Sequence, residues 1–173
     1  KEAGGHLGTD ESLRILLPQV KEAVSIPVIA AGGIVDVQDL KEAFSLGADG
    51  VQMGIRFAAS VEANGADSLK ELYLKATRED IVLIDSPVGL LGRAIRNEFA
   101  DSIINDTVEP PQACEGCLKK CRQNFCIMEA LNNAQQGNLK YGLAFSGEYI
   151  EKITEILPAG EIVANLVKEY EAL

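Results

Sequence analysis

The chain has 173 residues, of which 47% are hydrophobic and 24% charged, and its net charge is −10. This composition is typical of about one globular domain, and the mixing of Lys and Arg with acidic residues argues against binding to nucleic acid or to an anionic membrane surface. The sequence also has no apolar run near the roughly 20 residues that a membrane span requires.

Residues 1–9 are predicted to form a glycine-rich loop, KEAGGHLGT, which holds the only histidine of the chain, His6. We expect a helix to follow, capped by Thr9 or Asp10, because apolar residues then recur at helical spacing. The next run, IPVIAAGG at 26–33, is short and wholly apolar, which is typical of a strand buried on both faces.

The same order of elements then repeats. Asp36 is a good N-cap for a second helix, Gly47 is placed to end it, and ADGVQMG at 48–54 is typical of a second short strand. Helices that alternate with short apolar strands, each strand followed by glycine, predict an α/β fold with parallel strands.

The remainder of the chain is predicted to be mostly helical. Helical spacing extends over 55–78, DIVLID at 80–85 is an extended run, and GLLGRAIRNEFADSII at 89–104 is predicted to be a helix. A cysteine-rich segment follows and is expected to continue as a helix to about Gln136. A last amphipathic helix is predicted at about 158–172.

Both predicted strands end in glycine-containing loops, Gly32-Gly33 and Gln52-Met53-Gly54. The carboxyl ends of parallel strands carry the functional site in such folds, and glycine lets backbone N–H groups approach a ligand. Two such loops, each leading into a helix, predict a phosphate cradle like the one after strands 7 and 8 of a (β/α)₈ barrel. The alternative is that these glycines only permit tight turns.

Three stretches in this order, EAGGHLG, IPVIAAGGI and LGADGVQMGIRF, resemble the FMN-dependent nitronate monooxygenases, also called 2-nitropropane dioxygenases, and the similar flavin enoyl-[acyl carrier protein] reductases. LLGRAIRNEF and GEYIEKITEILPAGEIVANLV resemble later segments of the same family, so the resemblance covers nearly the whole chain apart from the cysteines. It implies a TIM barrel with FMN at the carboxyl face of the strands and an inserted helical lid.

The resemblance also implies roles for individual residues. His6 corresponds to the acid–base group that faces the flavin, and histidine suits that role because its pKa lies near working pH. The family usually has Thr or Ser at the position of Ile55, so the resemblance does not predict a hydroxyl contact with the phosphate at this position. The residues expected to bind FMN are Gly4, Gly5, Gly32, Gly33, Gln52, Met53, Gly54 and Ile55.

The expected organisation has four parts. They are the last strands and phosphate loops of a TIM barrel (1–60), a helical lid-like insertion (61–108), a Cys-rich helical segment (109–137) and a C-terminal helical tail (138–173). A (β/α)₈ barrel needs about 200 residues or more, and only two clear barrel strands are found in this sequence. We therefore interpret the chain as the C-terminal part of a longer enzyme.

All four cysteines, Cys114, Cys117, Cys121 and Cys126, lie close together with the spacing C-x2-C-x3-C-x4-C. Thiolates are soft ligands, so this spacing predicts an iron–sulfur cluster or a Zn²⁺ ion in a reducing cytoplasm. The spacing differs from the ferredoxin run and lacks the paired C-x2-C units of a zinc ribbon. A redox pair and small buried core residues are therefore alternatives.

The favoured hypothesis is a cytoplasmic FMN-dependent oxidoreductase that oxidises nitronates with O₂. It would act on a small molecule as a homodimer, without nucleic-acid or membrane partners. One alternative on the same fold is an NAD(P)H-dependent enoyl-[acyl carrier protein] reductase or NAD(P)H:flavin oxidoreductase. Others are a flavin-free phosphate-binding barrel fragment, against which EAGGHLG argues, and a metal-binding module built on the cysteines.

Overall fold

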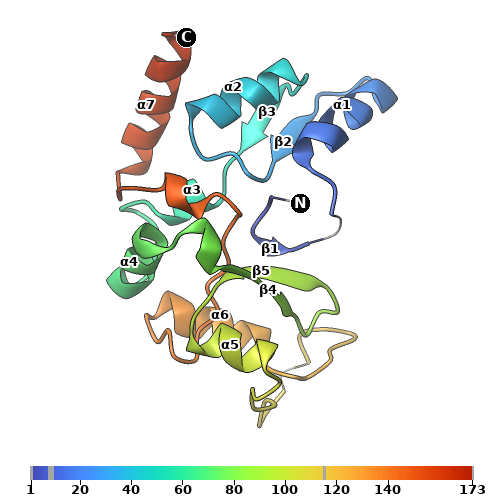
Figure 1. Ribbon diagram of the computed structural model, residues 1–173, viewed down its shortest axis with the longest axis vertical. Coiled ribbons are helices and arrows are strands. Elements are labelled where there is room, and N and C mark those ends of the chain that lie inside the picture. Colours follow the sequence, from blue (N-terminus) through green and yellow to red (C-terminus); the bar gives the residue numbers. More distant parts are fainter. Residues whose placement is uncertain (1, 8–9, 115, 173) are drawn as a thin grey trace.

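The chain folds into two small sheets with helices around them (Figure 1). The computed structural model describes residues 2–7, 10–114 and 116–172. One sheet is the parallel pair β2–β3, and the other is antiparallel with the strand order β1–β5–β4. The elements are β1 (Gly5–His6), α1 (Leu13–Ala23), β2 (Ile29–Ala31), α2 (Val37–Ser45), β3 (Gly50–Gln52), α3 (Ile55–Ala58), α4 (Asp67–Lys75), a 3₁₀ turn (Arg78–Asp80), β4 (Ile81–Asp85), β5 (Leu91–Ile95), α5 (Glu98–Ile104), α6 (Ile127–Gln135), a second 3₁₀ turn (Ile150–Lys152) and α7 (Ala159–Glu171).

The parallel pair has the helix–strand–helix–strand order that the sequence predicts. Ala30 of β2 lies opposite Val51 of β3, and α1 and α2 pack beside these strands. The last helix, α7, returns to cover α2, where the rings of Phe44 and Tyr170 meet edge to face at 5.6 Å. Both the parallel arrangement and the C-terminal helix are therefore confirmed.

Local capping explains where the first two long helices begin. Asp36 caps α2 as predicted, because its carboxylate accepts from the Asp39 N–H while the Asp39 carboxylate accepts from the Asp36 N–H. For α1 the prediction of Asp10 is wrong, since the cap is Ser12, whose hydroxyl accepts a backbone N–H at 3.3 Å. Thr9, the other predicted cap, lies outside the described residues.

The expectation that β2 is buried on both faces is wrong. Ala30 is buried among Leu17, Ile34 and Ala43 in the core of this half, whereas Ile29 is 57% exposed. The helices α1 and α2 contact this two-stranded sheet, and the alternation of side chains along a strand leaves Ile29 outside that core.

The antiparallel sheet is built from segments far apart in the sequence. β4 and β5 form a hairpin, and β1 pairs with the free edge of β5, which puts His6 opposite Gly92. The Leu7 N–H extends this pairing by donating to the Leu91 carbonyl at 2.8 Å. The histidine loop is therefore held in place by the hairpin.

The prediction of one helix over 89–104 is wrong, because its first part is β5 and only its second part is α5. Gly89, in the left-handed region with φ +85°, turns the chain back so that β5 pairs along the whole of β4. Four of the five β5 residues are buried, so long-range pairing and packing outweigh the helical spacing. Asn97 then caps α5 by accepting the Ala100 N–H at 2.8 Å.

Three further expectations of helix are corrected by the structure. The stretch 55–78 contains only the short α3 and α4, and the supposedly helical lid of 61–108 includes the β4–β5 hairpin. In the cysteine-rich stretch of 109–137, α6 begins at Ile127, after all four cysteines. The boundaries of the four parts stay a prediction.

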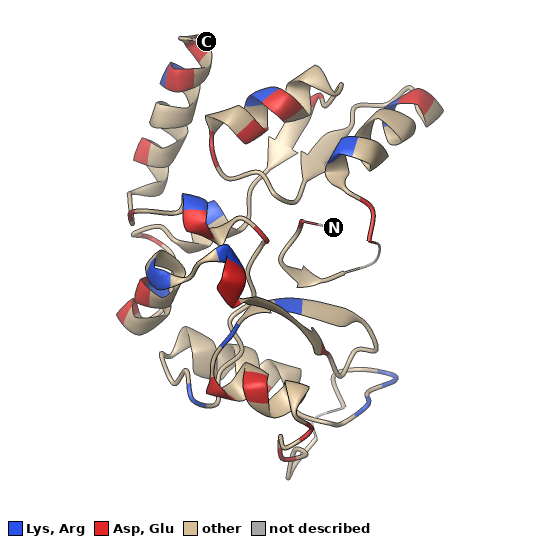
Figure 2. Ribbon diagram, in the orientation of Figure 1, with Lys and Arg blue, Asp and Glu red and all other residues tan. Residues whose placement is uncertain are grey.

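Charged residues of both signs share the surface of this fold. Figure 2 shows blue and red segments on the same helices, as on α1, α2 and α4. Among the described residues, no helix is both long enough and apolar enough to cross a membrane.

Candidate functional site

A cavity of about 450 Å³ lies at the carboxyl ends of β2 and β3, against the loop that carries β1. Its described lining residues include no Lys or Arg, so an anion in the cavity would be held by uncharged groups, chiefly backbone N–H donors. The structure brings together here nearly all the residues predicted to bind FMN. Those that line the cavity are Gly4, Gly5, Gly32, Gly33, Gln52, Gly54 and Ile55.

Met53 is the exception among these predicted residues. Its side chain packs against the buried core formed by Leu17, Ala30, Ile34 and Ala43, and it does not line the cavity. Only its backbone is placed to take part in the loop.

The glycines of the cavity have two different physical roles. At Gly5 and Gly54 an added Cβ would meet nothing within 4 Å, so these positions leave space open. At Gly33, whose φ is +70°, a Cβ would lie 2.7 Å from Glu2 Cβ. At Gly4 it would lie 2.6 Å from the carbonyl carbon of Ser146. Gly4 and Gly33 therefore allow segments of the chain to pack closely, while Gly5 and Gly54 leave room for a ligand.

The two helix starts near the cavity differ in their capping. The first turn of α2 is already capped by the Asp36 carboxylate, whereas Gly54 precedes α3 without any side-chain cap. Arg56, just inside α3, directs its guanidinium to the carbonyls of Ala59 and Glu155, at 3.2 and 2.8 Å. The open backbone donors are thus expected at 54–56 and in the Gly32-Gly33 loop.

His6 lies at the edge of this cavity, next to lining residue Gly5. Its ring meets Phe145, another lining residue, edge to face at 5.2 Å, and its Nε2 lies 2.7 Å from Ser86 Oγ. Burial lowers the pKa of the imidazole below its ordinary value, which favours the neutral form at pH 7. The side chain is nevertheless exposed enough for a small molecule to reach it.

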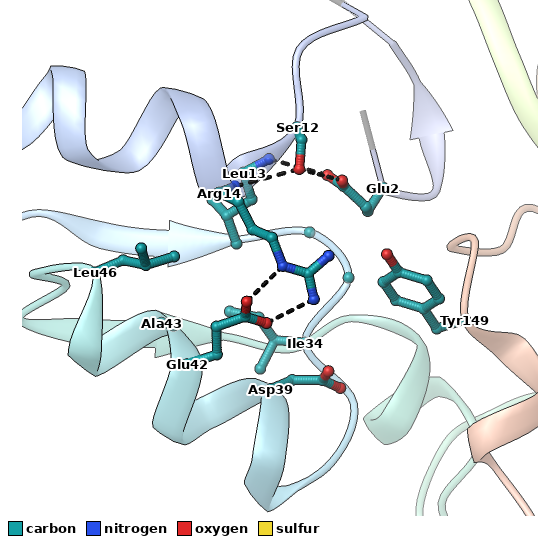
Figure 3. Close-up of a pocket in the computed structure, with 12 residues that line it drawn as sticks. Glu2, Ser12, Leu13, Arg14, Ile34, Asp39, Glu42, Ala43, Leu46 and Tyr149 are labelled. Carbon is teal, nitrogen blue, oxygen red and sulfur yellow. Dashed lines mark hydrogen bonds and ion pairs between the residues drawn. The ribbon is translucent and has the colours of Figure 1, made fainter.

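The loop that carries His6 is fixed at its start by Glu2. Figure 3 shows the Glu2 carboxylate directed at the beginning of α1, where it accepts the Ser12 hydroxyl at 2.7 Å and the Leu13 N–H at 3.1 Å. Burial alone would raise the pKa of Glu2, but these hydrogen bonds outweigh it and hold that pKa below its ordinary value. Arg93, buried in β5, donates to the Ala3 carbonyl at 3.0 Å and secures the other side of the loop.

Four residues of the segment 145–149 line the cavity and were not predicted. Phe145 and Tyr149 contribute rings, and Ser146 and Gly147 contribute a close backbone approach. Tyr149 also faces the small pocket drawn in Figure 3, where Arg14 pairs with Glu42. The expectation of a helical tail over 138–173 is wrong for this segment, which is not helical; its Ser-Gly pair was the available signal of a turn.

The cysteines lie apart from this cavity, around a separate hollow of about 390 Å³ that all four of them line. Cys114 and Cys117 are exposed and none is fully buried, so the reading as buried core is wrong. Within the described ranges, no three His, Cys, Asp or Glu side chains are grouped closely enough to hold a metal ion. The metal site at Cys114, Cys117, Cys121 and Cys126 stays a prediction.

Comparison with known proteins gives a consistent result. The sequence model of the nitronate monooxygenase family matches residues 1–169. A probable nitronate monooxygenase of Staphylococcus aureus (strain MSSA476) is 38% identical over 99% of this chain and 49% of that protein. One of Bacillus subtilis (strain 168) is 32% identical over 97% of this chain and 49% of that protein.

Solved structures agree with this match. FabK from Thermotoga maritima superposes with a TM-score of 0.82 at 35% identity, covering 99% of this chain and 52% of that one. A nitroalkane oxidase from Streptomyces ansochromogenes gives a TM-score of 0.72 at 26% identity, covering 99% and 50%. The chain thus spans about half the length of these relatives. The expected fold class, α/β and part of a TIM barrel, is confirmed.

Proposed function

The chain belongs to the nitronate monooxygenase family, and from that premise we propose that it supplies the phosphate cradle and the acid–base histidine of an FMN-dependent oxidoreductase. The proposed reaction is the oxidation of nitronates with O₂, where the nitronate is either supplied as such or formed when His6 takes the proton from a nitroalkane carbon. The observation that carries the proposal is the convergence of the glycine loops after β2 and β3 with the His6 loop around one cavity.

The residues of this cavity fit a flavin phosphate. Open space lies beside Gly5 and Gly54, and a cradle without a lysine or arginine among its described lining residues suits binding by backbone N–H groups. Gly32 and Gly33 would supply the first loop of the cradle, and Gln52, Met53, Gly54 and Ile55 the second. When bound, FMN would supply the electron transfer between substrate and O₂.

The proposed role of His6 is to move a proton at the substrate carbon. Its pKa is lowered by burial, so the imidazole is neutral at pH 7 and able to accept a proton from a nitroalkane. Phe145 packs edge to face on the ring and helps to hold it at the cavity edge. Such a group typically contributes about 100-fold to 10,000-fold in rate.

A second candidate is an NAD(P)H-dependent enoyl-[acyl carrier protein] reductase, because the T. maritima FabK structure superposes on this chain over nearly its whole length. The same cavity and histidine would then serve protonation of an enoyl thioester. A small-molecule substrate follows from either candidate. A cytoplasmic location, a homodimer and an iron–sulfur cluster or Zn²⁺ ion at the cysteines stay predictions.

The experiment that separates these candidates is anaerobic flavin reduction in the purified protein, followed at the visible band of oxidised flavin. We expect bleaching by the nitronate of 2-nitropropane and restoration of the band on admitting O₂. Bleaching by NADH or NADPH instead, with restoration by crotonyl thioester, would favour the reductase. A protein that binds no FMN at all would contradict both candidates.

A further inference from the structure

We propose that Ser86 is a positioning residue that holds the His6 imidazole by its Nε2 atom, leaving Nδ1 as the nitrogen that exchanges a proton with the reactants. The observation is the 2.7 Å contact between Ser86 Oγ and His6 Nε2, which joins residues 80 positions apart. The functional half of this inference rests on the proposed acid–base role of His6.

The position of Ser86 is set by its backbone. It follows β4 directly and begins the hairpin turn, where its N–H donates to the Leu90 carbonyl at 3.1 Å and its carbonyl accepts the Gly89 N–H at 3.0 Å. The residue is 0% exposed. The two hydrogen bonds restrain the backbone of Ser86, and burial restrains its side chain. The hydroxyl is therefore held in one position against the imidazole ring of His6.

The hydroxyl suits this task because it accepts as well as donates. With Nε2–H donating to Ser86 Oγ, the Nδ1 lone pair is free to take the proton released from the substrate carbon. The imidazolium that results keeps the same Nε2–H bond, so the contact with Ser86 serves the ring before and after transfer. The oxygen also lies 3.5 Å from the Val88 N–H, which is too long to compete strongly.

Packing on the ring restrains it in a second direction. Phe145 meets the imidazole edge to face at an interplanar angle of 71°. Gly92, opposite His6 in the sheet, makes room for this ring, because a Cβ there would lie 2.9 Å from Phe145 Cε1. Hydrogen bond and aromatic contact together define one ring orientation.

The close Ser–His contact also suggests a nucleophilic serine, but burial argues against it. A nucleophile must be reached by its substrate, and Ser86 is 0% exposed behind the ring. The hydroxyl therefore acts on the reaction through His6.

The test combines a tautomer measurement with a mutant cycle. In the ¹⁵N-histidine-labelled protein with bound FMN, we expect His6 to be mainly the Nε2–H tautomer when neutral, with its signals assigned by their loss in His6→Asn. A dominant Nδ1–H tautomer in the unmodified protein would overturn the inference without any variant.

In Ser86→Ala we expect loss of this tautomer preference and, with a nitroalkane as substrate, a fall in kcat of about tenfold or more, with FMN affinity unchanged. Ser102→Ala, which removes a hydroxyl that donates to the Phe99 carbonyl within α5, is the matched control and should keep both. Adding Ser86→Ala to His6→Asn should cost nothing more, because Ser86 acts through the ring.

The outcomes separate the two proposals. One outcome is that His6→Asn loses turnover while Ser86→Ala behaves like Ser102→Ala. Another is that the losses of turnover from His6→Asn and Ser86→Ala multiply in the double variant. In either case the positioning role of Ser86 fails and the acid–base role of His6 stands. If His6→Asn keeps full turnover, the proposed function of His6 fails, and the tautomer measurement alone decides whether Ser86 holds Nε2.

Discussion

The parallel pair β2–β3 and the antiparallel sheet β1–β5–β4 border the same cavity but bring different chemistry to it. The parallel strands end in loops that offer backbone N–H groups and the space left by glycine. The antiparallel sheet holds one side chain, His6, by strand pairing and by Ser86. Changes in the loops of the first sheet should therefore affect cofactor affinity, and changes at His6 or Ser86 should affect turnover.

The largest effect is expected at the histidine. His6→Asn should lower kcat with a neutral nitroalkane as substrate by about 100-fold to 10,000-fold, because the group that takes the proton from the substrate carbon is lost. The affinity for FMN should not change, since His6 does not line the cavity. Steady-state kinetics measures the change in kcat, and FMN titration measures the affinity for the cofactor. If His6→Asn lost FMN binding together with turnover, the separate roles of the two sheets would be contradicted.

A stability effect is expected where the antiparallel sheet is joined to the segment that carries Phe145. Asn97 caps α5 and also donates to the carbonyls of Leu139 and Gly142, at 2.9 and 2.8 Å. Asn97→Ala should lower the free energy of unfolding by about 2 kcal/mol. Urea unfolding measures this change.

Two companion variants sharpen that result. Asn97→Ser keeps a capping oxygen but loses the two donated bonds, so it should cost an intermediate amount. Asn105→Ala removes an exposed amide at the other end of α5 and should leave stability nearly unchanged. Equal losses in all three would show that the bonds of Asn97 are not the cause.

The pH dependence of kcat/KM should reflect the titration of His6. Burial places the pKa of His6 below its ordinary 6.5, so the neutral base persists as pH falls to about neutrality and is lost only as pH passes through the lowered pKa. With a nitroalkane as carbon acid, kcat/KM should be flat at and above about pH 7 and decline below 6.5. An inflection above 6.5 would contradict the burial argument.

The smallest effect on turnover is expected at the cysteines, whose hollow is separate from the cavity. Cys114→Ser with Cys117→Ser should leave FMN binding and nitronate oxidation unchanged. If the predicted metal site is correct, the same variant should lose the iron or zinc of the anaerobically purified protein, measured by elemental analysis. A protein free of both metals before mutation would refute that site.

Features with local causes were predictable from the sequence. Asp36 was found from capping chemistry, and the loops at Gly32-Gly33 and Gly54 from apolar runs that end in glycine. Features that depend on distant partners were missed. Nothing near Leu91 in the sequence shows that β5 pairs with β1, and nothing near Ser86 shows that it meets His6. The β4–β5 hairpin itself is local, and the Ser-Pro-Val-Gly turn at 86–89 was the available signal for it.

The glycine-lined cavity is proposed to bind FMN, and FMN titration of two matched glycine variants is a direct test of this binding site. Gly33 is unsuitable for this test because a Cβ added there would clash with Glu2. A Cβ added at Gly54 or Gly160 would meet open space. Gly54 lines the cavity and Gly160 lies at the start of α7, away from it. We predict that Gly54→Leu weakens FMN binding by about tenfold or more while Gly160→Leu leaves the Kd unchanged. Equal Kd values for the two variants would contradict the binding of FMN in this cavity.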